Sequence, residues 1–374
     1  MKIIPLYLPQ FHQIPENDEW WGEGFTEWTN VKKAIPLFKG HYQPRVPLNK
    51  NYYDLTDVEA LKWQCEIARK YGIYGFCFYH YWFNGKLLLE KPMEILLAHP
   101  EIKINYCISW ANHNWEDSWK ASEGREKILI SHDFDDEEDW VAHFNYMLPF
   151  FKDQRYISEE NKPLLTIYIP NIIGKLNKML VLWNKMAVEV GFNGLKYAFQ
   201  SAMSHQSKGW DRSMFDYGIE FQPGYVSNKK SKLSLLNIMR YSQSIKKALG
   251  IKIRLQKTQK KVALLDYDQT WEQILKNKPS EQNAIPSAFV DWDNTARKKQ
   301  AGKVYLGATP TKFKKYFKQL IVKARKEYKT DKIFVFAWNE WAEGGYLEPD
   351  EKFEHGYLKA IHSALKETNE LNDR

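Results

Sequence analysis

The sequence lacks the signatures of several common classes of protein. It contains no Walker loop, no G-x-G-x-x-G and no G-x-S-x-G elbow, which argues against nucleotide hydrolysis, dinucleotide binding and serine-hydrolase chemistry. No stretch approaches the roughly 18 consecutive apolar residues of a membrane-spanning helix. The first ten residues also lack the long apolar segment and the small-residue cleavage site of a signal peptide. We therefore expect a cytoplasmic protein without a membrane span.

Cysteine is scarce as well. The three cysteines, Cys65, Cys77 and Cys107, are odd in number, widely spaced and set in apolar segments. Buried free thiols fit this pattern better than a disulfide or a metal site, because no zinc or haem spacing is present. We predict no metal and no other cofactor.

Aromatic residues, by contrast, are abundant. They make up 15% of the 374 residues and include 15 Trp and 22 Tyr, which is more than core packing usually requires. Such a composition is typical of proteins that stack on flat ligands such as sugar rings. The apolar fraction of 44% is that of an ordinary globular protein with a sizeable core. Carbohydrate is therefore the leading class of ligand.

Short apolar runs of strand length recur along the chain and mostly alternate with helical patterns. The eight candidate strands are residues 3–7, 75–78, 103–109, 164–169, 195–200, 217–221, 287–290 and 333–337. This alternation, without a glycine-rich phosphate loop, predicts an α/β fold of the (β/α)₈ barrel type with long rim loops, in a single domain over 1–374. The first and last strands should pair to close the barrel.

One segment interrupts the alternation. Residues 226–265 hold eleven Lys or Arg and no Asp or Glu, which is more than the net charge of +8 of the whole chain. Its apolar residues have helical spacing, so it is either an amphipathic helical insert with a solvated basic face or a surface for an anionic glycan, a lipid-linked glycan or a membrane. Nucleic acid is disfavoured, because aromatic residues do not alternate with the basic ones.

The most informative stretch is residues 334–349. An apolar run of strand length leads into Trp338-Asn339-Glu340-Trp341-Ala342-Glu343, and two glycines stop any long helix from following. Carboxyl groups three residues apart lie about 5–6 Å from each other in a turn-like segment, close enough to act on one bond. Two solvated loop acids are the alternative. The neighbouring tryptophans favour a site, because exposed tryptophan is costly unless something stacks on it.

Five segments together resemble a known family. They are residues 7–12 (YLPQFH), 22–31 (GEGFTEWTNV), 72–83 (GIYGFCFYHYWF), 110–112 (WAN) and 339–344 (NEWAEG). In this combination the chain resembles the WbsX-like proteins of bacterial surface-polysaccharide loci, which are similar to glycoside hydrolase family 99, the endo-α-mannosidase group. The resemblance covers nearly the whole chain apart from the basic insert.

The resemblance implies a (β/α)₈ barrel in which Glu340 and Glu343 are a catalytic pair. It implies that Glu340 deprotonates the sugar 2-hydroxyl, giving a 1,2-anhydro intermediate, while Glu343 serves as acid and then as base. The spacing is consistent with this chemistry, since the two carboxyl groups of retaining glycosidases lie about 5–5.5 Å apart. One departure from the family pattern is His113, where glutamate is expected. It puts local substrate contacts in doubt and leaves the acid pair intact.

Around the acid pair we predict the walls and hydrogen-bonding groups of a sugar site. These are Tyr7, Glu27, Trp28, His80, Trp82, Trp110, Asn112, Asn114, Trp292, Trp338, Asn339 and Trp341. Core packing is an alternative for the tryptophans and for His80, and Glu27 could instead pair with Lys32 or Lys33. Asp291 and Asp293 either reach the same rim or belong to a loop turn.

Three functions remain open. The first is a retaining glycoside hydrolase that acts on an α-linked bacterial polysaccharide through the glutamate pair. The second is a glycosyltransferase of surface-polysaccharide assembly, such as O-antigen, lipopolysaccharide or capsule, although no D-x-D motif is convincingly placed. The third is a non-catalytic carbohydrate-binding protein. In each case an oligosaccharide or polysaccharide is the expected ligand.

Overall fold

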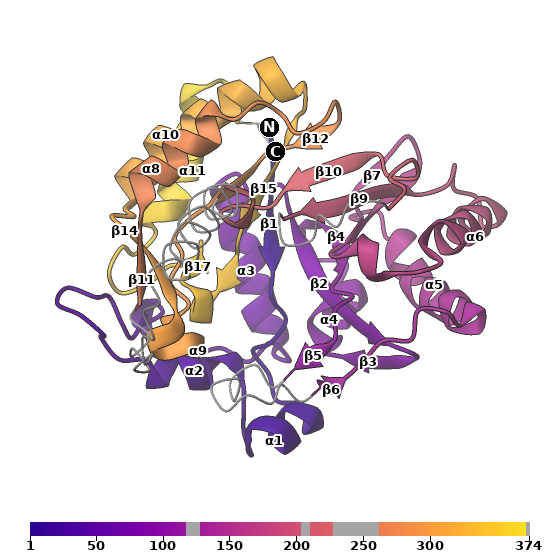
Figure 1. Cartoon of the computed structure of the whole chain (residues 1–374), viewed down its shortest axis with the longest axis horizontal. Helices are drawn as coiled ribbons and strands as arrows, with labels where there is room; N and C mark the ends of the chain where they lie inside the picture. Colours follow the sequence, from indigo (N-terminus) through magenta and orange to yellow (C-terminus); the bar gives the residue numbers. More distant parts are fainter. Residues whose placement is uncertain (117–127, 203–209, 227–261, 372–374) are drawn as a thin grey trace, which may run out of the picture.

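The computed structural model describes residues 1–116, 128–202, 210–226 and 262–371 of the chain. The helix predicted within the basic insert falls at 227–261, outside the described residues. Figure 1 shows strands gathered at the centre of the molecule, with helices on the outside.

The central sheet contains nine strands in sequence around its path, and neighbouring strands on this path run parallel. In sheet order they are β12 (Ala284–Ile285), β10 (Tyr217–Glu220), β9 (Lys196–Ser201), β8 (Lys162–Ile167), β4 (Asn105–Trp110), β2 (Gly75–Phe83), β1 (Lys2–Tyr7), β15 (Lys332–Phe336) and β13 (Ser287–Phe289). Each of the eight predicted strands has a counterpart, so the prediction of a (β/α)₈ barrel is confirmed.

The first and last strands of the chain close the barrel as predicted. Lys2 of β1 lies opposite Lys332 of β15, and Pro5 lies opposite Val335. The pairing brings the two ends of the described chain together (Figure 1). The ammonium group of Met1 lies 2.9 Å from a carboxylate oxygen of Glu370.

The seventh predicted strand is divided into two short strands by Pro286. β12, before the proline, pairs with β10, whereas β13, after it, pairs with β15. Proline has no N–H to donate, so the ladder is interrupted at this residue. Its carbonyl group still accepts a hydrogen bond from the Phe334 N–H at 3.2 Å. The divided segment therefore bridges the two ends of the sheet and leaves the barrel nearly closed.

Helices alternate with the barrel strands and cover their outer faces. α3 (Val58–Lys70) is the predicted helix after β1, and the Asp57 side chain caps it by accepting the Glu59 N–H. The other helices are α1 (Pro15–Trp21), α2 (Glu27–Lys33), α4 (Lys91–Ala98), α5 (Glu137–Phe151), α6 (Leu176–Glu189), α8 (Tyr267–Lys276), α9 (Thr295–Lys298), α10 (Pro310–Lys323) and α11 (Gly356–Glu367). No helix within the described ranges is long and apolar enough to cross a membrane.

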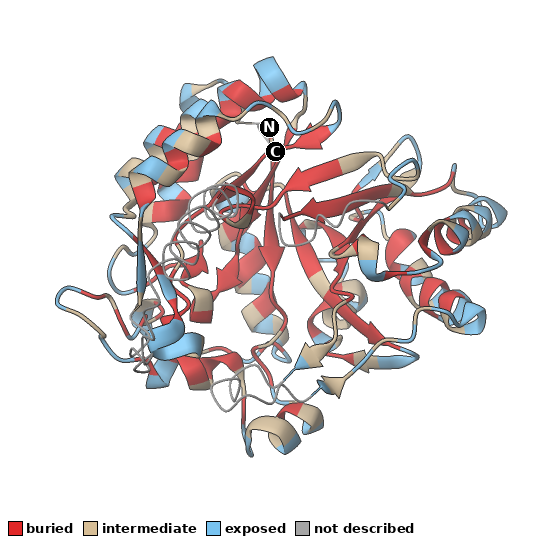
Figure 2. Ribbon diagram, in the orientation of Figure 1, coloured by how far each residue is buried: buried red, intermediate tan, exposed pale blue. Residues whose placement is uncertain are grey.

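The barrel strands are buried on both faces, as the red colouring of the central sheet in Figure 2 shows. All five residues of β15 are buried. Parallel strands with helices outside and side chains inside require such nearly continuous apolar sequences. Each large apolar side chain that is fully buried stabilises the fold by about 1.5–3 kcal/mol. Cys65, Cys77 and Cys107 are buried free thiols, as predicted.

A hairpin at the carboxyl end of β15 carries the acid motif. It consists of β16 (Asn339–Glu340), the turn η7 (Trp341–Glu343) and β17 (Gly345–Tyr346). Gly344 ends the turn with φ 65°, and a Cβ atom there would lie 2.9 Å from the backbone nitrogen of Asp293. A Cβ atom on Gly345 would lie 2.3 Å from the Phe336 ring. The two glycines therefore stop the helix, as predicted, and allow the hairpin to lie directly against the strand ends.

Short elements complete the rim and the connections. They are β3 (Lys86–Leu88), β5 (Trp115–Glu116), β6 (Ile128–Ile130), β7 (Ser158–Glu159), β11 (Ala263–Asp266), β14 (Lys303–Leu306), η1 (Leu48–Lys50), η3 (Pro170–Ile172), η5 (Lys299–Ala301) and the π-helical turn η6 (Ala324–Tyr328). β11 and β14 pair in a separate two-stranded parallel sheet.

Candidate active site

Asn339 fixes the hairpin to the end of β1. Its side-chain oxygen accepts the Leu8 N–H at 2.8 Å, and its side-chain nitrogen donates to the Leu8 carbonyl at 2.9 Å. The amide group thus replaces a backbone partner beyond the last residue of β1. Asn339 is fully buried, and this predicted sugar-binding residue serves to place Glu340 at the rim.

Glu340 and Glu343 meet at one arginine. Nη1 of Arg297 lies 2.9 Å from Glu343, and Nη2 lies 3.4 Å from Glu340. Nε of the same guanidinium lies 3.0 Å from Glu27. Arg297 belongs to α9, beyond the end of β13, and its side chain is 19% exposed. The ion pairs therefore lie at the rim, where barrel enzymes have their active sites, and not within the barrel wall.

The two acids differ in burial. The Glu340 side chain is 8% exposed and the Glu343 side chain 18% exposed. Burial raises the pKa of Glu340 to about 8, and the nearby Glu343 and Glu27 carboxylates add to the rise while Arg297 opposes it. A carboxyl group with this pKa carries a proton at neutral pH. The site therefore combines a protonated carboxyl group with two further carboxyl groups that share one cation.

Three tyrosines lie around the acid pair, and the sequence analysis did not select them. Tyr79 and Tyr81 belong to β2, and Tyr168 follows β8. Burial raises the pKa of each phenol, and the charge of Glu340 adds to the rise in all three. The phenols therefore lie near the pair and stay neutral, as hydrogen-bonding groups at the wall of the site. The His113 ring packs 5.4 Å from that of Tyr168, so the departure from the family pattern lies beside this wall.

The tryptophans of the motif are not exposed, and this expectation was wrong. Trp341 is 1% exposed because it stacks on Tyr346 at 3.8 Å and donates its N–H to Glu348 at 2.6 Å. Trp338 is fully buried against Phe76. Their large apolar surfaces hold the hairpin on the barrel end, and neither presents a free face to a sugar ring.

Glu348 is a third buried acid of the hairpin region, and it too was missed. It accepts hydrogen bonds from Trp341, from Tyr53 at 2.8 Å and from Gln64 at 2.7 Å. Burial raises its pKa to about 7. Because three protein donors satisfy its oxygens, we assign Glu348 a role in packing the hairpin.

Trp28 and Tyr7 lie in the same packed region. Trp28 is buried, contacts the Trp341 ring at 5.4 Å and donates its N–H to the Tyr53 carbonyl at 2.8 Å. The Tyr7 hydroxyl donates to Gln64 of α3 at 2.6 Å. Both side chains are thus turned toward buried protein partners.

His80, Trp82 and Trp110 are also buried, and they contact α5. Nε2 of His80 lies 2.9 Å from Nε2 of His143, and the Trp82 ring stacks on His143 at 4.8 Å. Trp110 packs edge-on against the same histidine at 4.8 Å. Burial lowers the pKa of His80 to about 3, so the imidazole is neutral. These residues form a packed aromatic group between the strands and the helix.

The two remaining asparagines make structural hydrogen bonds. Asn112 is fully buried and exchanges two hydrogen bonds of 2.8 Å with the backbone of Ile169, which extends the junction of β4 and β8. Asn114 accepts the His132 N–H at 2.9 Å. Both therefore order rim loops.

The predicted aspartates lie behind the acid pair. Asp291 accepts a hydrogen bond from Arg45 at 2.9 Å, and Asp293 contacts His41 and Gln43 at 2.8 Å each. Trp292, between them, stacks on the Phe336 ring at 4.8 Å. The two aspartates therefore support the loop that carries Arg297.

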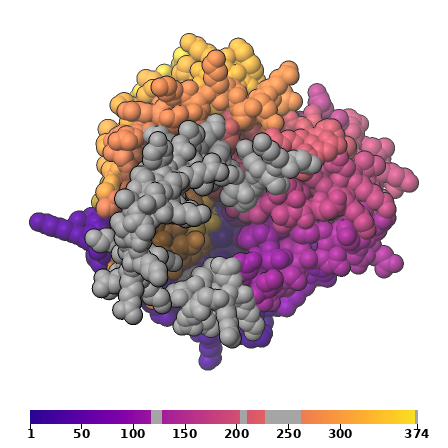
Figure 3. Space-filling model, viewed as in Figure 1, coloured from indigo at the N-terminus to yellow at the C-terminus, as the bar shows by residue number. Residues whose placement is uncertain are grey.

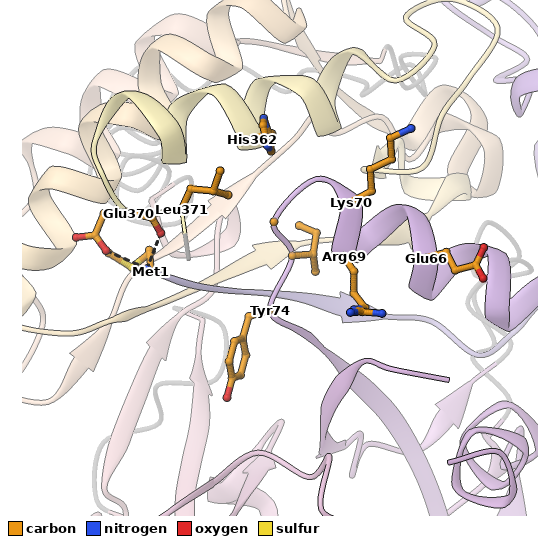
Figure 4. Close-up of a pocket in the computed structure, with 10 residues that line it drawn as sticks. Met1, Glu66, Arg69, Lys70, Tyr74, His362, Glu370 and Leu371 are labelled. Carbon is orange, nitrogen blue, oxygen red and sulfur yellow. Dashed lines mark hydrogen bonds and ion pairs between the residues drawn. The ribbon is translucent and has the colours of Figure 1, made fainter. Parts of the chain in front are cut away.

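Figure 3 shows the molecule in the same orientation as a space-filling surface, which is hollowed near its middle. A different cavity, of about 380 Å³, lies at the amino-terminal ends of β1 and β2 (Figure 4). Its lining includes Met1, Arg69, Tyr74, His362 and Glu370. This second cavity is at the end of the barrel opposite the acid pair.

Solved structures share this architecture. The family 99 endo-α-mannosidase of Bacteroides thetaiotaomicron, in complex with bis-tris propane, superposes with a TM-score of 0.57 at 14% identity, over 98% of this chain and 97% of the other. A glycoside hydrolase-like protein superposes with a TM-score of 0.55 at 13% identity, over 97% and 93%. Identities this low support a common fold. The class is thus an α/β barrel of the kind found in glycoside hydrolases.

Residues 3–361 match the family described as glycosyltransferase WbsX, and the chain belongs to this family. Two uncharacterized proteins called WxcX, from strains of Xanthomonas campestris pv. campestris, are each 30% identical over 366 residues. That match covers 97% of this chain and 49% of each relative, so the chain spans about half the length of the curated relatives it matches.

Proposed function

We propose that the protein is a retaining glycoside hydrolase that cleaves α-linked bacterial polysaccharide with Glu340 and Glu343. The observation that carries the proposal is the meeting of both carboxyl groups at one guanidinium on the carboxyl-end rim of the barrel. Glycoside cleavage requires one protonated carboxyl group at the leaving oxygen and a second, ionised group on the other side of the reaction. A buried acid with a raised pKa beside an ion-paired one supplies both forms at neutral pH.

The fold of the family 99 endo-α-mannosidase supports a glycan as the substrate. The three tyrosines beside the acids would give hydroxyl groups to a sugar. The eleven basic residues of the insert would add attraction for an anionic or lipid-linked glycan.

A glycosyltransferase is the second candidate, because the family description names that activity. Such an enzyme would act in surface-polysaccharide assembly and would need an activated sugar donor. A non-catalytic carbohydrate-binding protein is the third candidate. Both acids are retained in this chain, which speaks against it.

The test is a screen for turnover of α-linked oligosaccharides with and without nucleotide-sugar donors. We expect cleavage without a donor, with the anomeric configuration retained in the first product. Glu340→Gln and Glu343→Gln should each lower turnover by roughly 10²–10⁴ while leaving glycan binding nearly intact, the range expected when a positioned proton-transfer group is lost. Glu351→Gln, an exposed acid a few residues along, is the matched control.

Each alternative gives a different outcome. Activity that depends on a donor would replace the hydrolase by the transferase. Binding of glycan without turnover under either condition would replace it by the binding protein.

A further inference from the structure

The contacts of Arg297 with the two acids are unequal. Its Nη1 lies 2.9 Å from Glu343, which is a charge-assisted hydrogen-bond distance, whereas Nη2 lies 3.4 Å from Glu340, close to the outer limit for a bond. Glu340 is also the more buried of the two, so its charged form has less water and the weaker protein partner. Both differences favour the anion at Glu343 and the neutral carboxyl group at Glu340.

The position of the guanidinium is fixed from two sides. Glu27 is buried and holds Nε at 3.0 Å, and its own Oε1 also accepts a hydrogen bond from Asn30 at 3.3 Å. On the other side, the Asp293 carboxylate accepts the Thr295 N–H at the start of α9. The Asp293 N–H in turn donates to the Glu343 carbonyl at 2.7 Å. One residue therefore ties the helix of Arg297 to the backbone of Glu343.

The groups that face Glu340 come from four places on the rim. They are Arg297 of α9, Glu343 of η7, Glu27 of α2, and the tyrosines beside the pair, Tyr79, Tyr81 and Tyr168. Since the tyrosines are neutral at ordinary pH, one positive charge faces three carboxyl groups. A single proton on the group with the poorest contact reduces the repulsion.

We infer that Arg297 is a positioning residue that holds Glu343 as the anion and leaves the proton of the acid pair on Glu340. This inference deepens the proposed hydrolase function and rests on it for its catalytic consequence. If the pair cleaves glycosides, Glu340 is the group that protonates the leaving oxygen, and Glu343 is the anionic partner. This order is the reverse of the one that the family resemblance implies.

The location of the proton is tested without any substrate. Side-chain ¹³C NMR of the full chain at neutral pH, with resonances assigned through Glu340→Gln and Glu343→Gln, should show Glu340 protonated and Glu343 ionised. Arg297→Met should raise the pKa of both carboxyl groups, and Arg297→Lys should keep Glu343 ionised. Lys298→Met, an exposed residue of the same helix, should change neither. A proton on Glu343, or unchanged titration in Arg297→Met, would overturn the inference.

The catalytic consequence is tested with substrates whose leaving group needs no proton, such as an α-glycosyl fluoride. Glu340→Gln should lower fluoride turnover by less than about tenfold, although it lowers oligosaccharide turnover by roughly 10²–10⁴, because proton donation is the step it removes. Glu343→Gln should lower both. The opposite pattern would overturn the assignment of Glu340 as donor while leaving the proposed function standing. No turnover of either substrate by the wild-type protein would defeat the proposed function, and the NMR result would still stand on its own.

Discussion

Two glutamates at opposite ends of the barrel have opposite surroundings. At the carboxyl-end rim, Glu340 is one of three carboxylates on a single arginine. At the amino-terminal end, Glu370 accepts from two cations, Arg325 at 2.6 Å and the Met1 ammonium group at 2.9 Å (Figure 4). Burial raises the pKa of Glu340 to about 8, whereas Arg325 lowers the pKa of Glu370 to about 2.

The comparison teaches that the ratio of charges and the access of water decide what a carboxyl group does. An excess of cations at a partly exposed acid gives a permanent anion that joins the ends of the chain. An excess of acids at a buried site keeps one of them protonated, which costs stability and creates a proton donor. The rim therefore has the unfavourable electrostatics typical of a site of chemistry, and the opposite end has those of a structural contact.

The largest difference between the two ends should appear when the arginines are removed. Arg297→Met leaves buried carboxylates without their cation and should lower the free energy of unfolding by about 3–5 kcal/mol near pH 8. Arg325→Met should lower it by less than about 1 kcal/mol, because the Arg325 side chain is 44% exposed. Urea unfolding of the two variants beside the wild type measures both values. Equal losses would show that the two ion clusters do not differ as described.

A smaller effect with opposite signs should follow from neutralising each glutamate. A raised pKa in the folded state means that the contribution of Glu340 to stability is full below its ordinary value near 4.5 and is lost as pH rises toward about 8. Glu340→Gln should therefore be more stable than the wild type at pH 9, by an amount on the order of a few kcal/mol.

For Glu370 the sign is reversed. Its contribution is present above about pH 4.5 and is lost as pH falls toward about 2. Glu370→Gln should be less stable than the wild type at pH 7, with the difference shrinking as the solution is acidified. Thermal unfolding across pH 2–9 compares both variants, and a Glu340→Gln variant that loses stability at pH 9 would contradict the account.

The sequence predicted the architecture well because the strands are buried on both faces and therefore carry uninterrupted apolar runs. It did not reveal the division at Pro286, since the residues on both sides are equally apolar and differ only in the neighbour they pair with. The acid pair was found because its two members are close in sequence. Whether it is catalytic stays a prediction.

The surroundings of the pair were harder to predict. Side chains alternate along a strand, and on β2 the residues selected, His80 and Trp82, face α5, whereas Tyr79 and Tyr81 lie near the acids. The choice of the correct face required knowing which side of the strand is inside the barrel. Arg297 had no local signal at all, because its partners are 43, 46 and 270 residues away.

The central claim is that at neutral pH the proton of the rim pair is on Glu340. Infrared difference spectroscopy measures this directly, because a protonated carboxyl group has a carbonyl stretch that an ionised carboxylate lacks. The account predicts a band at pH 7 in the wild type that is absent in Glu340→Gln, persists in Glu343→Gln and fades above about pH 8. A wild-type spectrum identical to that of Glu340→Gln in this region, or a band lost only in Glu343→Gln, would contradict it.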